Sequence, residues 1–338
     1  MSVAPIRVWA PSASEVSLLV DGGRRRLTGA AGGWWEDGQT LPAGTRYRVS
    51  LDGGDGVADP RSPWQPDGVD GPSATVDHAD FGWTDAMWNG PVPLASAVFY
   101  ELHVGTFSAE GTFDGVIERL GHLRGLGVTH VELMPVAEFD GDRGWGYDGV
   151  LLYAPHHHYG GPAGLARLVD ACHREGLAVV LDVVYNHLGP SGNHLARFGP
   201  YFTDRYATPW GDAVNLDGRG SDEVRRFFVD NALMWLRDFH VDALRLDAVH
   251  ALLDTSATHL LEQLAVIKPK LVVFLGRHAM NVFLPQLKIS QAHGRAFRRG
   301  GQVYMPLYHP AAALYNGGMR QEHLSDFAGI PQVLAQLS

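Results

Sequence analysis

The pattern that most constrains the fold is an alternation of continuous apolar strands with helices between residues 94 and 264. Strands that are apolar along their whole length are buried on both faces, which is typical of a parallel sheet covered by helices. Repeated strand–helix units of this kind predict a (β/α) barrel. The expected strands are residues 97–106, 128–136, 177–185 and 241–249, and the expected helices are residues 113–126, 162–175 and 222–239.

These four strands make only half of a TIM-type barrel, which has eight strands and takes about 250 residues. Of the 338 residues, 89 follow the fourth expected strand. The sequence therefore predicts an incomplete (β/α) barrel within an α/β protein. A long polar insert at residues 186–220 follows the third strand, so we expect it at the functional face.

The chain falls into three segments of different composition. Residues 1–92 are rich in Gly, Pro and Asp and carry short alternating runs, which predicts an N-terminal β-sandwich. Residues 93–262 hold the half barrel, and residues 263–338 form an α/β segment with a strand at 271–275. This last segment carries eight basic and two acidic residues, whereas the whole chain has a net charge of −10. Such an asymmetry indicates different partners for the two parts.

Composition excludes several classes of protein. Cys172 is the single cysteine, which excludes an intramolecular disulfide and an iron–sulfur cluster held by four cysteines of this chain. No run of about 18 apolar residues is present, so we expect no membrane-spanning helix. The first residues lack the charged-then-apolar layout of a secretory signal. A cytoplasmic protein without membrane contact is the expectation.

Residues 241–250 form a short apolar strand that ends by presenting Arg245, Asp247 and His250 beyond its C-terminal edge. A nearby guanidinium favours the ionised form of a carboxyl group. An ionised carboxylate at a strand end suits a nucleophile that attacks an electron-poor sugar carbon. A salt-bridged structural aspartate is the alternative interpretation of the same pattern.

Two further segments carry groups that suit sugar binding. Asp182, Asn186 and His187 lie at the end of the third expected strand, where they can hydrogen-bond several hydroxyl groups of one sugar. Trp145 and Tyr147 offer aromatic faces on which a sugar ring can stack. Taken one at a time, buried aromatic residues and strand-end aspartates are also common structural features of α/β proteins.

Other histidines of this segment predict no site of their own. His156, His157 and His158 are adjacent, and neighbouring side chains of an extended chain point to opposite sides, so three in a row rarely converge on one metal ion. We expect a solvated loop there and no metal. His103, on the first strand, is expected to be a hydrogen-bonded barrel residue.

Residues 182–187 and 243–250 resemble the first and second signature regions of glycoside hydrolase family 13, the α-amylase superfamily. Within that family the finer resemblance, over about residues 3–264, is to the trehalohydrolases of maltooligosyltrehalose. The N-terminal sandwich is similar to the carbohydrate-binding-like domain that precedes the barrel in those enzymes. The resembling stretches are residues 100–107, 144–150, 186–193 and 231–242.

The resemblance implies a retaining glycosidase that hydrolyses the α-1,4 bond next to the terminal trehalose of maltooligosyltrehalose, or binds a maltodextrin, without a metal or organic cofactor. It makes Asp247 the nucleophile and Arg245 the electrostatic partner of that nucleophile. The substrate-binding candidates are then Asp182, Asn186, His187, Trp145, Tyr147 and His250.

The chain departs from the family at the general acid. Family enzymes carry this Glu after the fifth strand and a His-Asp pair after the seventh, and the acid and the nucleophile lie about 5–5.5 Å apart. Here Gly276, Arg277 and His278 follow the strand at residues 271–275, and none of them is a carboxylate. We therefore expect the hydrolytic activity of this chain to be impaired.

The last 76 residues resemble instead the C-terminal part of a uracil-DNA glycosylase of the iron–sulfur type, family 4. The resemblance lies in residues 267–281 and 303–314. It implies a DNA-facing surface that includes His309, Arg298 and Arg299, and the excess of basic residues agrees with a weak nucleic-acid contact. Two alternatives to a trehalohydrolase-type enzyme thus stay open: a glycosylase-like DNA-binding fragment and a fusion without function.

Overall fold

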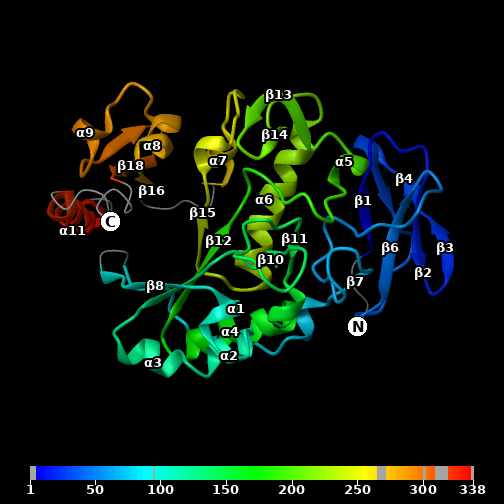
Figure 1. The fold of residues 1–338 in the computed structure, drawn as a ribbon, viewed down its shortest axis with the longest axis horizontal. Helices are drawn as coiled ribbons and strands as arrows, with labels where there is room; N and C mark the ends of the chain where they lie inside the picture. Colours follow the sequence, from blue (N-terminus) through cyan, green and yellow to red (C-terminus); the bar gives the residue numbers. More distant parts are fainter. Residues whose placement is uncertain (1–4, 94–95, 265–271, 300–301, 309–318, 336–338) are drawn as a thin grey trace.

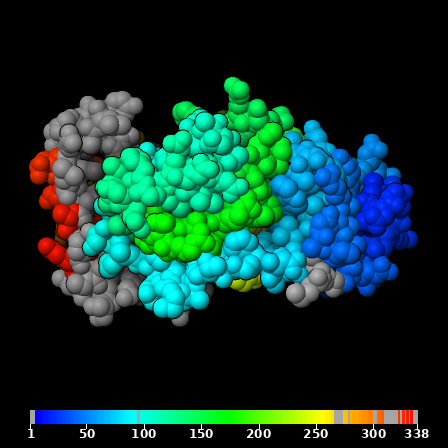
Figure 2. Space-filling model, turned by 90° about the horizontal axis from the view of Figure 1, so that it is seen from below, coloured from blue at the N-terminus to red at the C-terminus, as the bar shows by residue number. Residues whose placement is uncertain are grey.

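The computed structural model describes residues 5–93, 96–264, 272–299, 302–308 and 319–335. Its elements follow one long axis, with the N-terminal strands at one end, a parallel sheet in the middle and the C-terminal elements at the other end (Figure 1). A perpendicular space-filling view shows the same order along the molecule (Figure 2).

The N-terminal part consists of two antiparallel sheets, with the orders β3-β2-β6-β7 and β1-β5-β4. Val16, Leu18 and Val49 are fully buried between them. Asp-Gly turns separate some of these strands, and in them Asp21 and Asp52 take positive φ values of 52° and 50°. The elements are β1 (Arg7–Trp9), β2 (Val16–Val20), β3 (Gly23–Arg26), β4 (Thr28–Gly29), η1 (Ala31–Gly33), β5 (Trp34–Glu36), β6 (Arg46–Leu51), β7 (Ser73–Ala74) and η2 (His78–Asp80).

A four-stranded parallel sheet with the order β15-β12-β9-β8 forms the middle of the molecule. β12 is buried along its whole length, as its continuous apolar sequence predicts, and α4 packs against it. The predicted α/β architecture, a β-sandwich followed by strand–helix units, is confirmed. The elements are β8 (Phe99–Leu102), β9 (His130–Leu133), α4 (Gly161–Arg174), β12 (Ala178–Val183), α6 (Ser221–Asp238) and β15 (Ala243–Leu246).

The helix expected at residues 113–126 is broken into two, α2 (Phe113–Ile117) and α3 (Leu120–Gly125). Between them Arg119 has a φ of −109° and a ψ of 0°, so the helical path is interrupted. Gly115 and Gly121 weaken a continuous helix, because glycine costs about 1 kcal/mol relative to alanine in a helix interior.

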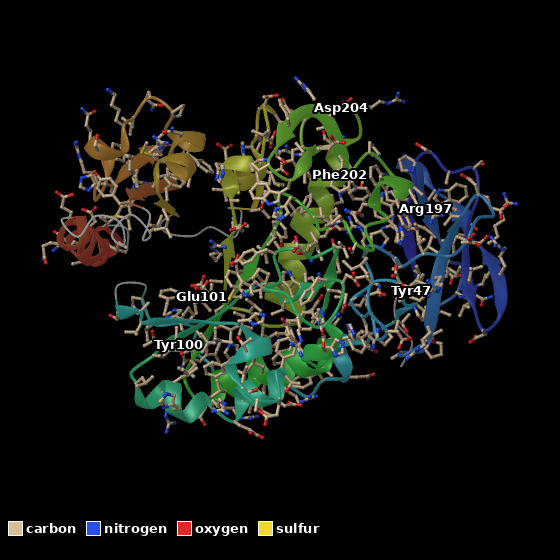
Figure 3. The ribbon with its side chains drawn as sticks, viewed as in Figure 1. Tyr47, Tyr100, Glu101, Arg197, Phe202 and Asp204 are labelled. Atoms are coloured by element: carbon tan, nitrogen blue, oxygen red, sulfur yellow. The ribbon has the colours of Figure 1, made fainter. Side chains whose placement is uncertain are left out.

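Three segments extend beyond the C-terminal ends of the parallel strands. After β8 the chain turns into α1 (Val104–Phe107), so the first strand is shorter than expected. After β9, β10 (Ala137–Glu138) and β11 (Leu151–Pro155) enclose the loop of residues 139–149, and η4 (His157–Tyr159) follows. The insert after β12 holds α5 (Leu195–Phe198) and a hairpin of β13 (Phe202–Thr208) and β14 (Gly211–Val214); Arg197, Phe202 and Asp204 mark it in Figure 3.

The C-terminal elements form a separate three-stranded sheet with the order β16-β18-β17, so β16 is not a fifth strand of the barrel sheet. Apolar residues of these C-terminal elements nevertheless join the core of the barrel segment. Helix α8 contacts η5 (Val249–Ala251). The ring of Phe283 lies 6.0 Å from that of His259, next to α7 (Leu260–Leu264). Among the helices that the structure describes, none is long and apolar enough to cross a membrane. The elements are β16 (Val272–Leu275), α8 (Arg277–Phe283), α9 (Ile289–Ala292), β17 (Phe297–Arg299), β18 (Gln302–Leu307) and α11 (Met319–Ala335).

Candidate active site

The candidate site lies where β12 and β15 end side by side. The two strands pair in parallel, with Asp182 opposite Arg245. Because side chains alternate between the two faces of a strand, Asp182, Arg245 and Asp247 project from the same face of the sheet. The backbone N–H of Asp247 donates to the carbonyl oxygen of Val183 at 3.0 Å, which holds the predicted nucleophile beside β12.

One guanidinium nitrogen joins the two carboxylates. Arg245 Nη1 donates to Asp182 Oδ2 at 2.6 Å and to Asp247 Oδ1 at 2.9 Å. The hydroxyl group of Tyr147 donates to the same Asp182 Oδ2 at 3.0 Å. Asp182 Oδ1 is buried and has no hydrogen-bond partner among the residues that the structure describes. A buried acceptor without a donor costs free energy, so Oδ1 is the atom that a hydroxyl group of a ligand would satisfy.

Burial and charge act in opposite directions in this cluster. Burial raises the pKa of Asp182, although Arg245 and the Tyr147 hydroxyl lower it in part. Burial alone would lower the pKa of Arg245, but Asp182 and Asp247 raise it above its usual value, so the guanidinium stays charged. Burial, and then the negative charge of Asp182, raise the pKa of Tyr147, which keeps its hydroxyl group a donor. The cluster therefore places one permanent cation between two carboxylates.

His187 and Asn186 lie beside the cluster and are bonded to the protein. The amide of Asn186 donates to His187 Nδ1 at 2.8 Å, and His187 Nε2 donates to the carbonyl oxygen of Tyr147 at 2.9 Å. Burial lowers the pKa of His187. Trp210, at the tip of the β13–β14 hairpin, stacks on the imidazole with a centroid distance of 4.5 Å and an interplanar angle of 6°. Trp210 is not among the residues predicted from the sequence, although the Pro and Gly on either side of it mark the turn that exposes it.

Trp145 and His250, the two other predicted sugar-binding residues, are exposed. Trp145 is 72% exposed on the loop of residues 139–149. His250 is exposed in η5, where Ala248, with a φ of 39°, turns the chain out of β15. The structure thus brings Asp182, Arg245, Asp247 and Tyr147 into one hydrogen-bonded cluster and leaves these two side chains around it.

The prediction of a solvated loop at His156, His157 and His158 is wrong, although His158 is exposed. His156 is fully buried, and the turn of η4 brings the first two rings to a centroid distance of 4.8 Å. They meet Glu138, whose Oε1 lies 2.8 Å from His157 Nδ1 and 3.8 Å from His156 Nε2. Burial raises the pKa of Glu138 to about 8 and lowers that of His156 to about 3. These three side chains have the spacing of a candidate cation site, with donor atoms within 4.8 Å of one another. His157 hydrogen-bonds to Glu138, however, and His156 to the carbonyl oxygen of Gly141.

Two carboxyl groups lie deeper on the same face of the sheet. Glu101 of β8 and Glu132 of β9 pair side by side, and Glu132 is opposite Val180, two residues before Asp182. Burial, and then Glu101, raise the pKa of Glu132. Figure 3 shows Glu101 on the edge strand β8, next to Tyr100. Both glutamates precede the strand ends, so neither takes the position expected of a general acid.

The C-terminal residues expected to face DNA are only partly described. Arg298 is exposed in β17, and Arg299 ends the same strand. His309 lies outside the described residues. The structure therefore places two of the three predicted residues on one strand of the C-terminal sheet.

Comparison with known proteins gives two family matches. Residues 69–200 match the α-amylase catalytic domain, and residues 189–328 match the uracil-DNA glycosylase superfamily. The chain is 56% identical to malto-oligosyltrehalose trehalohydrolase of Arthrobacter ramosus, over 80% of this chain and 48% of the relative. It is 41% identical to the enzyme of the same name from Saccharolobus solfataricus, over 97% of this chain and 58% of the relative.

Among solved structures, a putative α-amylase from Salmonella typhimurium has a TM-score of 0.74 and 42% identity, over 78% of this chain and 45% of that one. The chain thus spans about half the length of the proteins it matches. The region that holds Tyr147, Asp182 and His187 is an α-amylase-type catalytic-domain sequence, related to that of the malto-oligosyltrehalose trehalohydrolases.

Proposed function

We propose that this chain is a glycoside hydrolase of the trehalohydrolase type, which binds maltooligosyltrehalose or a maltodextrin and acts on the α-1,4 bond next to the terminal trehalose. The observation that carries the proposal is the pair of Asp182 and Asp247, bridged by Arg245 at the ends of neighbouring parallel strands. The 56% identity to a trehalohydrolase supports the substrate class.

In this proposal Asp247 attacks the anomeric carbon and forms a glycosyl–enzyme bond, while the electron pair of the breaking C–O bond goes to the leaving oxygen. Arg245 orients the attacking carboxylate through its 2.9 Å hydrogen bond. The free Oδ1 of Asp182 accepts a hydrogen bond from a sugar hydroxyl group. The remaining sugar-facing residues are Asn186, His187, Trp145, Tyr147 and His250.

The leaving oxygen also needs a proton, which a second carboxyl group supplies in retaining glycosidases. Asp182 does not suit this role, because its Oδ2 accepts hydrogen bonds from both Arg245 and Tyr147. Glu132 lies opposite Val180, two residues before Asp182, and so precedes the end of the strands. We therefore propose that the chain binds its substrate weakly and hydrolyses it slowly.

A substrate whose leaving group needs no proton isolates the step assigned to Asp247. With α-maltosyl fluoride the C–F bond breaks, fluoride leaves with the electron pair, and a bond forms to a carboxylate oxygen. We expect the wild-type chain to release a burst of fluoride and to gain the mass of one maltosyl group, whereas Asp247→Asn does neither. Equal fluoride release from both proteins, or none from the wild type at high protein concentration, would contradict the proposal.

The match of residues 189–328 to the uracil-DNA glycosylase superfamily favours a second function, a nucleic-acid contact. We propose that residues 263–338 make this contact through Arg298, Arg299 and His309. Binding to uracil-containing DNA should weaken with salt and with Arg298→Ala, and stay unchanged with Arg26→Ala, whose guanidinium is 67% exposed on the sandwich. A chain that heparin does not retain, or equal losses in both variants, would count against this contact.

A further inference from the structure

The loop that carries Trp145 and Tyr147 is fastened at three points by histidines from three different parts of the chain. Each histidine follows a strand and donates its Nε2–H to one carbonyl oxygen of the loop. The three accepting residues are spaced three positions apart. The three hydrogen bonds are His156 to Gly141 at 3.1 Å, His103 to Gly144 at 2.7 Å and His187 to Tyr147 at 2.9 Å.

The hydrogen bonds at the opposite ring nitrogens agree with this direction of donation. Each Nδ1 faces a donor group, and a nitrogen that accepts a hydrogen bond carries no proton in the neutral ring. A carbonyl oxygen can only accept, so the Nε2 that faces the loop carries the proton in each of these hydrogen bonds. His103 Nε2 also lies 3.0 Å from the Tyr159 hydroxyl, which can accept from the same N–H. The donors to Nδ1 are the backbone N–H of His158 at 3.2 Å, the hydroxyl of Thr106 at 3.0 Å and the amide of Asn186 at 2.8 Å.

The backbone of this loop has little order of its own. Residues 139–149 contain four glycines, and glycine loses more conformational freedom on ordering than any other residue. Gly146 has a φ of 89°, and a Cβ there would lie 2.0 Å from the carbonyl oxygen of Pro135, so this position requires glycine. Hydrogen bonds from outside the loop must therefore offset the cost of ordering it.

We propose that His103, His156 and His187 are positioning residues that hold the loop of residues 139–149 so that Trp145 and Tyr147 contact a bound sugar. Tyr147 links the fastening to the site, because its carbonyl oxygen accepts from His187 and its hydroxyl donates to Asp182 Oδ2 at 3.0 Å. The inference rests on the proposed function only for the identity of the ligand. In this inference His187 acts by holding the loop, which does not require direct contact with the sugar.

His103 offers the test, because it lies outside the carboxylate cluster and is only half buried. His103→Phe keeps a ring and removes the donor, whereas His103→Gln keeps an N–H donor without the ring. Arg143, in the loop, is 92% exposed, so trypsin cleavage of the Arg143–Gly144 bond reports the order of the loop. The exposed Arg219–Gly220 bond is the matched control site.

We expect His103→Phe to speed cleavage after Arg143 about fivefold, the equilibrium change given by one hydrogen bond of ordinary strength, and to leave cleavage after Arg219 unchanged. The dissociation constant for maltotriose, measured by titration calorimetry, should rise by about the same factor. His103→Gln should restore most of both quantities. Wild-type cleavage rates in His103→Phe would overturn the proposal, and equal changes in the Phe and Gln variants would assign the effect to ring packing instead of donation.

One further outcome separates this inference from the proposed function. If the wild type binds neither maltotriose nor maltooligosyltrehalose, the proposed ligand is wrong, while the cleavage rates still decide whether the histidines order the loop.

If His103→Phe loses its cooperative thermal transition, Thr106→Val takes its place, because Thr106 is exposed and its loss frees the ring to carry its proton on Nδ1. We expect about twofold faster cleavage after Arg143 in that variant, and no change would overturn the proposal.

Discussion

Replacing His173 by glutamine should destabilise the segment of residues 81–92, which connects the sandwich to the barrel sheet. The loss of stability should be larger near pH 6 than near pH 9. The His173 side chain is 1% exposed, with Nδ1 3.0 Å from Asp85 Oδ2 and Nε2 3.0 Å from Asp242 Oδ2. Both nitrogens therefore donate to carboxylates, which requires the charged ring. Trp88 stacks on this ring at 4.7 Å and donates to Asp242 Oδ1 at 2.8 Å, so the connecting segment depends on the same charge.

The sign of the pH dependence follows from the direction of the pKa shift. Burial lowers the pKa of His173, but its hydrogen bonds to Asp242 and Asp85 outweigh burial and raise it above the usual 6.5. A group with a raised pKa in the folded state contributes stability that is complete below the unfolded pKa and is lost as the pH rises through the folded pKa. Removing one member of a buried ion pair costs about 3–5 kcal/mol. Glutamine keeps one neutral donor, so we expect a loss of about 2–3 kcal/mol near pH 6 and about 1 kcal/mol near pH 9.

Urea unfolding followed by tryptophan fluorescence at the two pH values measures these free energies. His122→Gln is the matched control, because His122 is exposed on α3, and it should change the free energy of unfolding by less than about 0.5 kcal/mol at either pH. An equal loss at both pH values in His173→Gln would refute the reasoning, because it would show that the ring contributes by packing and not by charge.

Three further substitutions test the site. Gly146→Ala should weaken maltotriose binding about tenfold in titration calorimetry, because φ is 89° and a Cβ would lie 2.0 Å from a backbone carbonyl oxygen. Arg245→Met leaves Asp182 buried without its cation, so urea unfolding should show a loss of about 3 kcal/mol and α-maltosyl fluoride should release no fluoride. Trp210→Ala removes the ring stacked on His187 and should cost about 1 kcal/mol of stability. It also exposes that imidazole, so an NMR titration should show the lowered pKa of His187 moving back toward 6.5.

The carboxylate cluster could be predicted from the sequence because its geometry follows from local spacing. Parallel strands end at a common edge, and side chains two residues apart share a face, so Asp182, Arg245 and Asp247 had to meet once both strands belonged to one sheet. The convergence of Glu138 with His156 could not be predicted in this way. The turn of η4 breaks the alternation expected of an extended chain, and the partner strand β10 pairs across the loop of residues 139–149.

The C-terminal part shows the same limit of local reasoning. The strand at residues 272–275 could be located from its apolar residues. Which sheet that strand joins depends on pairing with residues 302–307, some thirty positions later in the chain. The three histidines that fasten the 139–149 loop follow three different strands, so no spacing within one segment indicates that they share a task.

The geometry of the cluster predicts how turnover depends on the leaving group. Asp182 and Asp247 share Arg245 Nη1, and Asp182 Oδ2 also accepts from Tyr147, so Asp182 does not suit the role of the acid that in a retaining glycosidase protonates the leaving oxygen from about 5–5.5 Å away from the nucleophile. Without that proton the leaving group departs as an anion, and its own acidity then controls the rate. We expect fluoride to leave from α-maltosyl fluoride faster than nitrophenolate from an aryl maltoside, and a sugar alcohol from maltooligosyltrehalose to be slowest. Equal rates for the three substrates in the pre-steady-state burst, which reports the bond-breaking step, would show that a proton donor acts in the site and that Asp247 does not work alone.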